Sequence, residues 1–171
     1  MSYYETWRKE KDASFKEENS PLPEELRENF IGLDYYPVNP DLVFAVDLEP
    51  DPTLEITTLQ MSKGTIKEYK RLGWFNFIVD GTPQRLAVYS YGDDVTDTFY
   101  IPFTDTTNGL ETYAGGRYFD AWFDEGKYQL DFNYAYSPYC AYNDKYTCPI
   151  PSSENKLMVP ILAGEKIFNG H

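Results

Sequence analysis

One hairpin signal constrains the fold of this chain more than any other feature: the run WFNFIVDGTPQRLAVYSY at residues 74–91. Asp80-Gly81 is a preferred pair for a two-residue turn, and β-branched and aromatic residues flank it on both sides. In the register that this turn sets, Phe75 faces Leu86, and the neighbouring pair is also apolar. Because apolar pairs then fall on both faces, the hairpin must be covered on both sides for part of its length.

The pattern before this hairpin changes from helical to alternating. In residues 3–18, Tyr4, Trp7, Lys11 and Phe15 fall at spacings of three and four, which predicts an amphipathic helix. Residues 24–30 predict a second, shorter helix. Alternation from residue 42 onward predicts strands. The expected strands are residues 42–48, 54–61, 65–72 with a kink at Gly73, 74–79, 82–91, 98–104, 110–113, 128–134 and 157–163. Residues 98–104 and 110–113 should pair as a second hairpin.

These elements predict a mainly β (α+β) fold. We expect a curled or closed antiparallel sheet or barrel of about eight strands, with two short N-terminal helices over an end or a face. An aromatic content of 18% favours strands. The length suits a single domain, residues 1–171, in which residues 1–31 form a helical segment packed on the β domain.

The charge balance excludes several kinds of partner. The net charge is −13 and the sequence pI is about 4.4, so nucleic acids and anionic lipids should be repelled. The N-terminal residues are charged and lack the apolar run of a signal peptide, and no later stretch has the length of a membrane span. We therefore expect a cytoplasmic chain without nucleic-acid or membrane partners. The oligomeric state is left open.

Residues 134–156 form a long segment without periodicity. Loops of this length in a compact domain are usually functional or disordered. This one contains five Tyr, two Cys and three Pro, a composition that argues against disorder. We expect an ordered loop that covers one end of the sheet.

The two cysteines in that loop, Cys140 and Cys148, have two open interpretations. They are either buried thiols that anchor the loop or partners in a disulfide, which a reducing cytosol would disfavour. A zinc site would need two further ligands, and the one histidine is the terminal His171. No metal is therefore expected.

Several catalytic mechanisms are improbable for this chain. With His171 alone, Ser-His-Asp and Cys-His arrangements are disfavoured, and no glycine-rich phosphate loop lies between a strand and a helix, so no cofactor is expected. Acid–base chemistry by carboxylates stays open, with Glu111, Glu154 and Asp105 as candidates. Each of them is also explained as a turn, edge or loop residue, because 28 acidic residues make coincidental pairs common.

Arg117 stands out because it follows two glycines. Its planar guanidinium could hold a carboxylate or phosphate at two points, or it could form a structural ion pair. Extending the expected second hairpin places Arg117 near Thr98, and hence near Asp97 or Asp120. A polar ligand pocket at the mouth of the sheet would add tyrosine faces and amides to this arginine. The expected ligand-binding residues are Arg117, Tyr113, Tyr118, Asn133, Tyr136, Tyr142 and Asn155.

The C-terminal run LDFNYAYSPYCAYNDKYTCPIPSSENKLMVPILAGEK resembles a bacterial and archaeal family known as domain of unknown function 1684. The resemblance rests on D-F-N, A-Y, C-A-Y, C-P, E-N and A-G-E, and on W, S-P-L, P-F and G-R-Y matches earlier in the chain. Ser137 departs from the family pattern, which has Asn there. The resemblance implies homology, a single-domain family and a prokaryotic source, and it implies no activity.

Three functional hypotheses follow. The first is a domain that binds a small polar or anionic molecule in an aromatic-lined pocket beneath residues 134–156. The second is a histidine-independent hydrolase or lyase in which Glu111 or Glu154 is the base and Arg117 holds an anionic group. The third is a structural or interaction module without a pocket. The sequence identifies neither a ligand nor a reaction.

Overall fold

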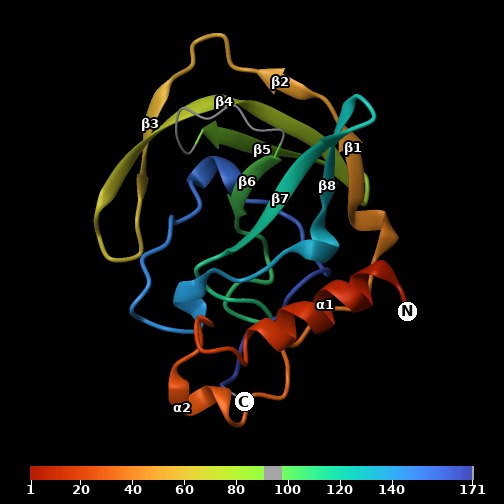
Figure 1. Cartoon of the computed structure of the whole chain (residues 1–171). Coiled ribbons are helices and arrows are strands. Elements are labelled where there is room, and N and C mark those ends of the chain that lie inside the picture. The colour runs from red at the N-terminus through yellow and green to blue at the C-terminus, as the bar shows by residue number, and fades with distance from the viewer. Residues whose placement is uncertain (91–97, 171) are drawn as a thin grey trace.

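The computed structural model describes residues 1–90 and 98–170 and shows two helices below two antiparallel sheets (Figure 1). The helices are α1 (Tyr3–Ser14) and α2 (Glu24–Arg27). The strands are β1 (Val43–Val46), β2 (Leu48–Pro50), β3 (Ile56–Gln60), β4 (Ile66–Val79), β5 (Thr82–Ser90), β6 (Thr98–Phe103), β7 (Arg117–Asp124) and β8 (Lys127–Asp131). The 3-10 turns are η1 (Pro40–Leu42), η2 (Phe132–Tyr134), η3 (Tyr139–Ala141) and η4 (Ser153–Asn155).

The strands form two four-stranded sheets. One has the order β1-β8-β7-β6, and in the other β4 pairs with β2, β3 and β5. Every pairing within these sheets is antiparallel, which confirms the mainly β prediction. The sheets are not closed into a barrel, so closure is not confirmed.

The β4–β5 hairpin has the predicted register. Phe75 pairs with Leu86, and both side chains are fully buried. The turn at Asp80 and Gly81 has positive φ at both residues, as this turn type requires. The register shifts next to Gly73, where a β-carbon would lie 2.1 Å from the Glu49 carbonyl oxygen. Glycine at this position therefore allows β2 to approach β4 closely.

The main core lies between the two sheets. Its centre is aromatic: the Phe119 and Phe132 ring centroids are 4.7 Å apart, and Phe75 is buried in the same cluster. The C-terminal segment contributes Leu157 and Ile161 to the same core. This segment is therefore part of the interior even though it forms no strand.

The two helices are shorter than predicted. The helix α1 begins with a capping box between Ser2 and Glu5 and ends at Ser14 rather than at residue 18. Its Trp7 ring lies 5.0 Å from that of Tyr134. Beyond it, a second cluster is formed by Phe15, Leu22, Phe30, Leu33 and Tyr142. This cluster attaches the N-terminal segment to the loop that carries the cysteines.

The predicted strand at residues 110–113 is wrong. Leu110 is 78% exposed, and the partner of β6 is β7, with Phe103 opposite Arg117. Turn residues explain the difference, because the Asp105 carboxylate accepts hydrogen bonds from Thr107 and bends the chain away from β6. Arg117 is therefore far along the strand from Thr98, contrary to the extrapolated register.

Three other predicted strands differ from the structure. Residues 42–48 are divided between β1 and β2, which lie in different sheets. Residues 128–134 form a strand only as far as Asp131, whose carboxylate accepts a hydrogen bond from the Asn133 backbone N–H and begins η2. Residues 157–163 form no strand, and Pro160 in their middle cannot donate to a ladder. Strand β7 was not predicted from the sequence, and a tight turn with positive φ at Glu125 and Gly126 joins it to β8.

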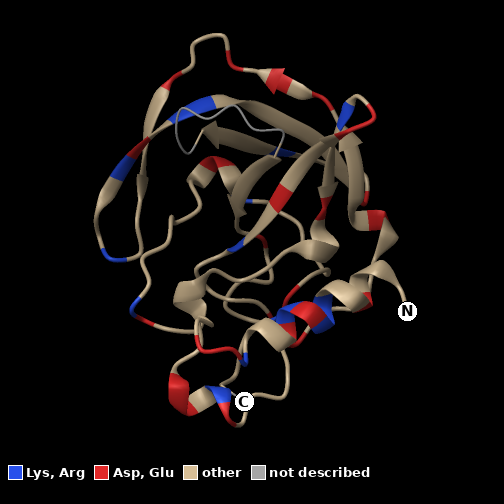
Figure 2. Cartoon of the chain, in the orientation of Figure 1, with Lys and Arg blue, Asp and Glu red and all other residues tan. Residues whose placement is uncertain are grey.

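Charged side chains are spread over helices, strands and loops, and α1 carries both signs (Figure 2). Among residues 1–90 and 98–170, no helix has both the length and the apolar character that crossing a membrane would require.

Candidate functional site

Arg117, the first residue of β7, is fully buried, and its guanidinium group donates four hydrogen bonds. Its Nη2 donates to Asp105 Oδ2 at 2.8 Å and to the Ile161 carbonyl at 2.8 Å. Its Nη1 donates to the carbonyls of Ala163, at 2.6 Å, and Glu165, at 3.1 Å. Four of its contacts thus fix the C-terminal segment and the loop after β6 against the sheet.

This environment differs from the predicted one. The ion-pair partner is Asp105, and both side chains are inaccessible to solvent. Asp120 instead accepts a hydrogen bond from the Tyr136 hydroxyl at 3.3 Å, and Asp97 lies outside the described residues. The Arg117 Nε has no hydrogen-bond partner, and the side chain lines none of the described cavities. The structure thus gives Arg117 a structural role.

Asn133 and Asn155 are also fully buried and bonded. The Asn133 amide exchanges hydrogen bonds with the backbone of Asn39, at 2.7 and 2.9 Å. The Asn155 oxygen accepts from the Ala87 N–H at 2.7 Å, while its nitrogen donates to the Ala87 and Pro102 carbonyls. Because Ala87 lies in β5 and Pro102 in β6, Asn155 joins the two sheets.

Two of the predicted tyrosines also face other groups. Tyr118 is buried, and its hydroxyl donates to the Pro149 carbonyl. Its backbone exchanges two hydrogen bonds of 2.8 Å with Tyr136, which holds the loop along β7. The Tyr113 hydroxyl donates to Cys140 Sγ at 3.9 Å.

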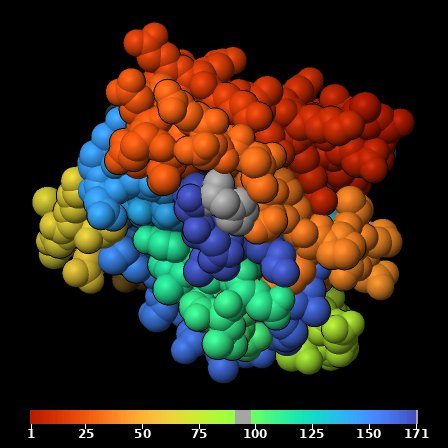
Figure 3. All heavy atoms as spheres, turned by 90° about the horizontal axis from the view of Figure 1, so that it is seen from below, coloured from red at the N-terminus to blue at the C-terminus, as the bar shows by residue number. Residues whose placement is uncertain are grey.

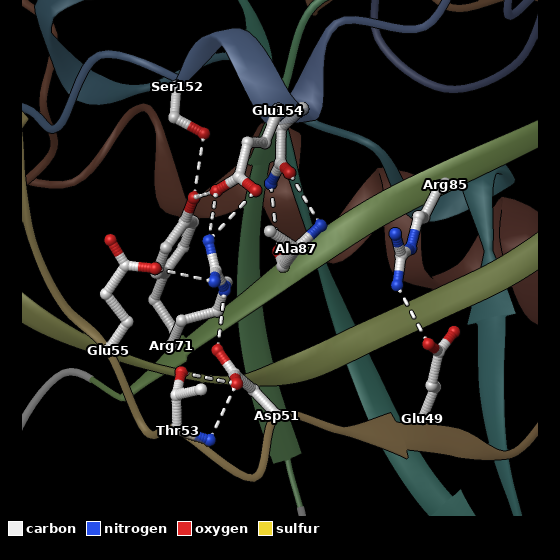
Figure 4. A network of polar contacts seen from close by, with 11 residues as sticks. Glu49, Asp51, Thr53, Glu55, Arg71, Arg85, Ala87, Ser152 and Glu154 are labelled. Atoms are coloured by element: carbon white, nitrogen blue, oxygen red, sulfur yellow. Dashed lines mark hydrogen bonds and ion pairs between the residues drawn. The ribbon is translucent and has the colours of Figure 1, made fainter.

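Glu154 belongs to an ion-pair network around Arg71 (Figure 4). Arg71 Nη1 lies 3.0 Å from Glu154 Oε1, and its Nε lies 2.8 Å from Asp51 Oδ2. The Tyr89 hydroxyl donates to the same glutamate at 2.8 Å. Burial raises the pKa of Tyr89 to about 12, and the Glu154 carboxylate adds to that rise. This network ties η4 to β4 and β5.

The other candidate carboxylates have partners of their own. The exposed Glu111 accepts a hydrogen bond from the Tyr36 hydroxyl at 3.1 Å, and Asp105 is the partner of Arg117. In the described part of the chain, no group of three or more His, Cys, Asp and Glu side chains could hold a metal ion.

A cavity of about 540 Å³ opens between α1 and residues 136–149. We call these residues the cysteine loop and the cavity the α1–loop pocket. Its lining residues are Trp7, Lys11, Ser14, Phe15, Tyr100, Tyr136, Ser137, Pro138, Tyr139, Tyr142, Tyr146, Thr147, Cys148 and Pro149. Tyr136 and Tyr142 are thus the only two of the predicted ligand-binding residues on this list. Seen from below, the N-terminal segment lies against the light-blue surface of residues near 140 (Figure 3).

In the α1–loop pocket, the Lys11 ammonium group is surrounded by one carboxylate and three aromatic rings. Lys11 Nζ lies 2.7 Å from Glu165 Oε2, and it lies 5.1 to 5.7 Å from the ring centroids of Trp7, Phe15 and Tyr136. Such contacts stabilise a cation when water is partly excluded. Sequence patterns did not indicate this ion pair as a site, although Lys11 falls within the aromatic spacing of the first helix.

Glu165 supports Lys11 from the interior. Its side chain is fully buried, and its second oxygen accepts a hydrogen bond from the Tyr142 hydroxyl. Burial raises the pKa of Glu165, and the Lys11 charge opposes that rise. The A-G-E motif that contains this residue was the available signal in the sequence.

Both cysteines are free thiols. Both are partly exposed, and Cys148 lines the cavity. A hydrogen bond between the two side chains lowers the pKa of Cys148 to about 6 and raises that of Cys140. Since both side chains are partly exposed, the expectation of buried thiols is not met in full.

A known protein family matches most of this chain. The family model described as "Protein of unknown function (DUF1684)" matches residues 28–166. The chain belongs to this family. The DUF1684 match spans Asp105, Arg117, Asn133, Asn155 and Glu165. It therefore includes the buried polar contacts described above, except for Lys11, which is the ion-pair partner of Glu165.

A solved structure of similar fold comes from an archaeon. The solution NMR structure of an uncharacterized protein from Haloarcula marismortui shares 33% sequence identity with this DUF1684 chain, with a TM-score of 0.74. The similarity covers 98% of this chain and 94% of that chain. The comparison with curated proteins gave no match.

Proposed function

We propose that this DUF1684 chain binds a small polar or anionic molecule in the α1–loop pocket. The observation that carries the proposal is a cavity of about 540 Å³ whose walls are aromatic and which contains the Lys11 ammonium. Small-molecule sites are commonly concave, mostly apolar and supplied with a few polar groups, in this range of volume.

The chemistry of the walls suggests the shape of the ligand. Rings such as Tyr136 and Tyr146 offer flat apolar surfaces with hydroxyl tips, which suit a planar or sugar-like body. Lys11 is the cationic side chain among the lining residues, and it can donate to a ligand anion as well as to Glu165. The negative net charge of the chain is screened over about 10 Å at ordinary ionic strength, so the local lysine governs recognition.

The alternatives are supported less well. A hydrolase or lyase in which Arg117 holds an anion lacks an accessible arginine, because that side chain is fully buried among Asp105 and three carbonyls. A purely structural module is favoured by the buried contacts of Arg117, Asn133 and Asn155, and none of these three residues lines the α1–loop pocket. The structural role and ligand binding are therefore compatible.

Native mass spectrometry of the full chain, followed by an NMR screen with small aromatic and sugar acids, tests the proposal. We expect a bound molecule or fragment whose affinity falls about tenfold or more in Tyr146→Ala, because one ring of the wall is lost. Tyr3→Ala is the matched control, since Tyr3 is 80% exposed and lies outside this pocket. Absence of any binder, or equal weakening by both variants, would contradict the proposal.

A further inference from the structure

Cys140 and Cys148 are held next to each other by separate parts of the fold. Cys140 lies in η3, whose turn is closed by a hydrogen bond from the Ala141 N–H to the Pro138 carbonyl. The Cys148 N–H donates a hydrogen bond to the Ser62 hydroxyl at 3.1 Å, and the Ser62 N–H donates one to the Cys148 carbonyl at 2.9 Å. Each backbone is therefore fixed by contacts of its own, and the two side chains are hydrogen-bonded to each other.

The two thiols differ in access and in partners. Cys148 lines the α1–loop pocket, whereas Cys140 is not among its lining residues and accepts a hydrogen bond from the Tyr113 hydroxyl at 3.9 Å. Both side chains are partly exposed, so a reagent can reach the pair. A dithiol with one member facing a cavity and the other behind it has the arrangement of an attacking and a resolving cysteine.

We propose that the Cys140–Cys148 pair is a thiol–disulfide exchange site that reacts with low-molecular-weight disulfides entering the α1–loop pocket. The Cys148 thiolate attacks one sulfur of the disulfide, whose S–S bond breaks and releases one thiol. The Cys140 sulfur then attacks Cys148 Sγ and releases the second thiol. The two cysteines are thereby oxidised to an internal disulfide, and the substrate disulfide is reduced to two thiols.

The electrostatics support this assignment of roles. The hydrogen bond from Cys140 lowers the pKa of Cys148 to about 6, and the backbone N–H groups of Tyr139 and Cys140 add to that effect. Of the other titratable groups nearby, burial raises the pKa of Tyr113 to about 12 and that of Tyr118 still further, so both stay neutral near pH 7. Thiolates, not thiols, attack disulfides.

The test uses the reduced full chain and 5,5′-dithiobis(2-nitrobenzoate) as the disulfide. In the wild type we expect two released thiolates per chain, the second at a rate independent of reagent concentration, and a product that has lost two hydrogens and carries no adduct. Cys140→Ser should release one thiolate and keep a stable mixed disulfide at Cys148. Cys148→Ser should react at least about tenfold more slowly.

Other outcomes would overturn the proposal. Two stable adducts per wild-type chain would show that the thiols do not resolve each other, and a lack of reaction until urea is added would show inert buried thiols. Equal rates for the two single variants would remove the assignment of roles. Urea midpoints of both variants separate a change in reactivity from a loss of fold. The test does not depend on the ligand of the pocket, so it can succeed or fail apart from the proposed function.

Discussion

At the scale of single residues, the Lys11–Glu165 ion pair places a fully buried carboxylate beside the α1–loop pocket. Glu165 is completely buried, whereas Lys11 keeps a small exposed fraction and three aromatic neighbours. Removing one partner of a buried pair leaves an uncompensated charge, which is more harmful than replacing both. The pair is therefore a sensitive probe of the pocket floor.

We expect Lys11→Met to lower the free energy of unfolding by about 3 kcal/mol at pH 7. The folded-state pKa of Glu165 is already raised by burial, and loss of Lys11 raises it further. A carboxyl whose folded-state pKa is raised binds its proton more tightly in the folded chain. The unfavourable effect of its ionised form on the free energy of unfolding therefore appears as the pH rises through the folded-state pKa. The loss should shrink at about pH 4, where the carboxyl is protonated.

Urea denaturation at both pH values measures this effect. Lys16→Met is the control, because Lys16 is exposed and should change stability by less than about 0.5 kcal/mol. A loss of equal size at both pH values would mean that Glu165 is not the group left unpaired.

Arg117 provides a second prediction at this scale. Arg117→Lys keeps the charge but cannot reach Asp105 and three carbonyls with one ammonium group, so we expect a loss of about 3 kcal/mol in the free energy of unfolding. Arg85→Lys is the matched control, because its partner Glu49 is exposed and such pairs contribute at most about 1 kcal/mol. Equal urea midpoints for the two variants would argue against a stabilising role of the Arg117 hydrogen bonds.

At the scale of elements, local chemistry predicted some parts of the fold well and others poorly. The β4–β5 hairpin was predictable because Asp80-Gly81 specifies its turn and register. The strand β7 was missed, since its register depends on a long loop closed by buried contacts of Asp105 with Thr107 and Arg117. Pairing across such a loop depends on tertiary contacts, which a short stretch of sequence does not reveal.

The hairpin turn can be tested by Gly81→Ala. Gly81 has a φ of +78°, and a side chain in this region destabilises the folded chain by about 1 kcal/mol. Thr82→Ala at the next position should change stability by less than about 0.5 kcal/mol, because Thr82 is exposed. Thermal or urea unfolding of the two variants decides the matter, and an unchanged midpoint for Gly81→Ala would contradict the assigned turn.

At the scale of the whole molecule, the C-terminal third holds the two sheets together. Asn155 bonds to Ala87 in β5 and to Pro102 in β6, and Arg117 fixes the segment that ends at Glu165. The sequence identified these motif residues, and a ligand for them stays a prediction. The pattern alone could not reveal the buried backbone groups that these side chains contact.

We therefore expect Asn155→Ala to weaken the contact between the sheets. Three buried backbone groups lose their partner, which lowers the free energy of unfolding by about 3 kcal/mol. Asn29→Ala, at an exposed position, is the control. Hydrogen exchange should show faster exchange of the Ala87 amide in Asn155→Ala, and unchanged protection there would contradict the role of this side chain.

The central claim is that the buried signature residues hold the fold while the α1–loop pocket is the accessible site. Its most direct test is an amide and side-chain shift map of the full chain, titrated with a molecule that the binding screen identifies. We predict the largest shifts at Trp7, Lys11 and residues 136–149, with the Arg117 Nε–H resonance unchanged. Shifts centred on Arg117 and Asp105, with the cysteine loop unaffected, would contradict the account.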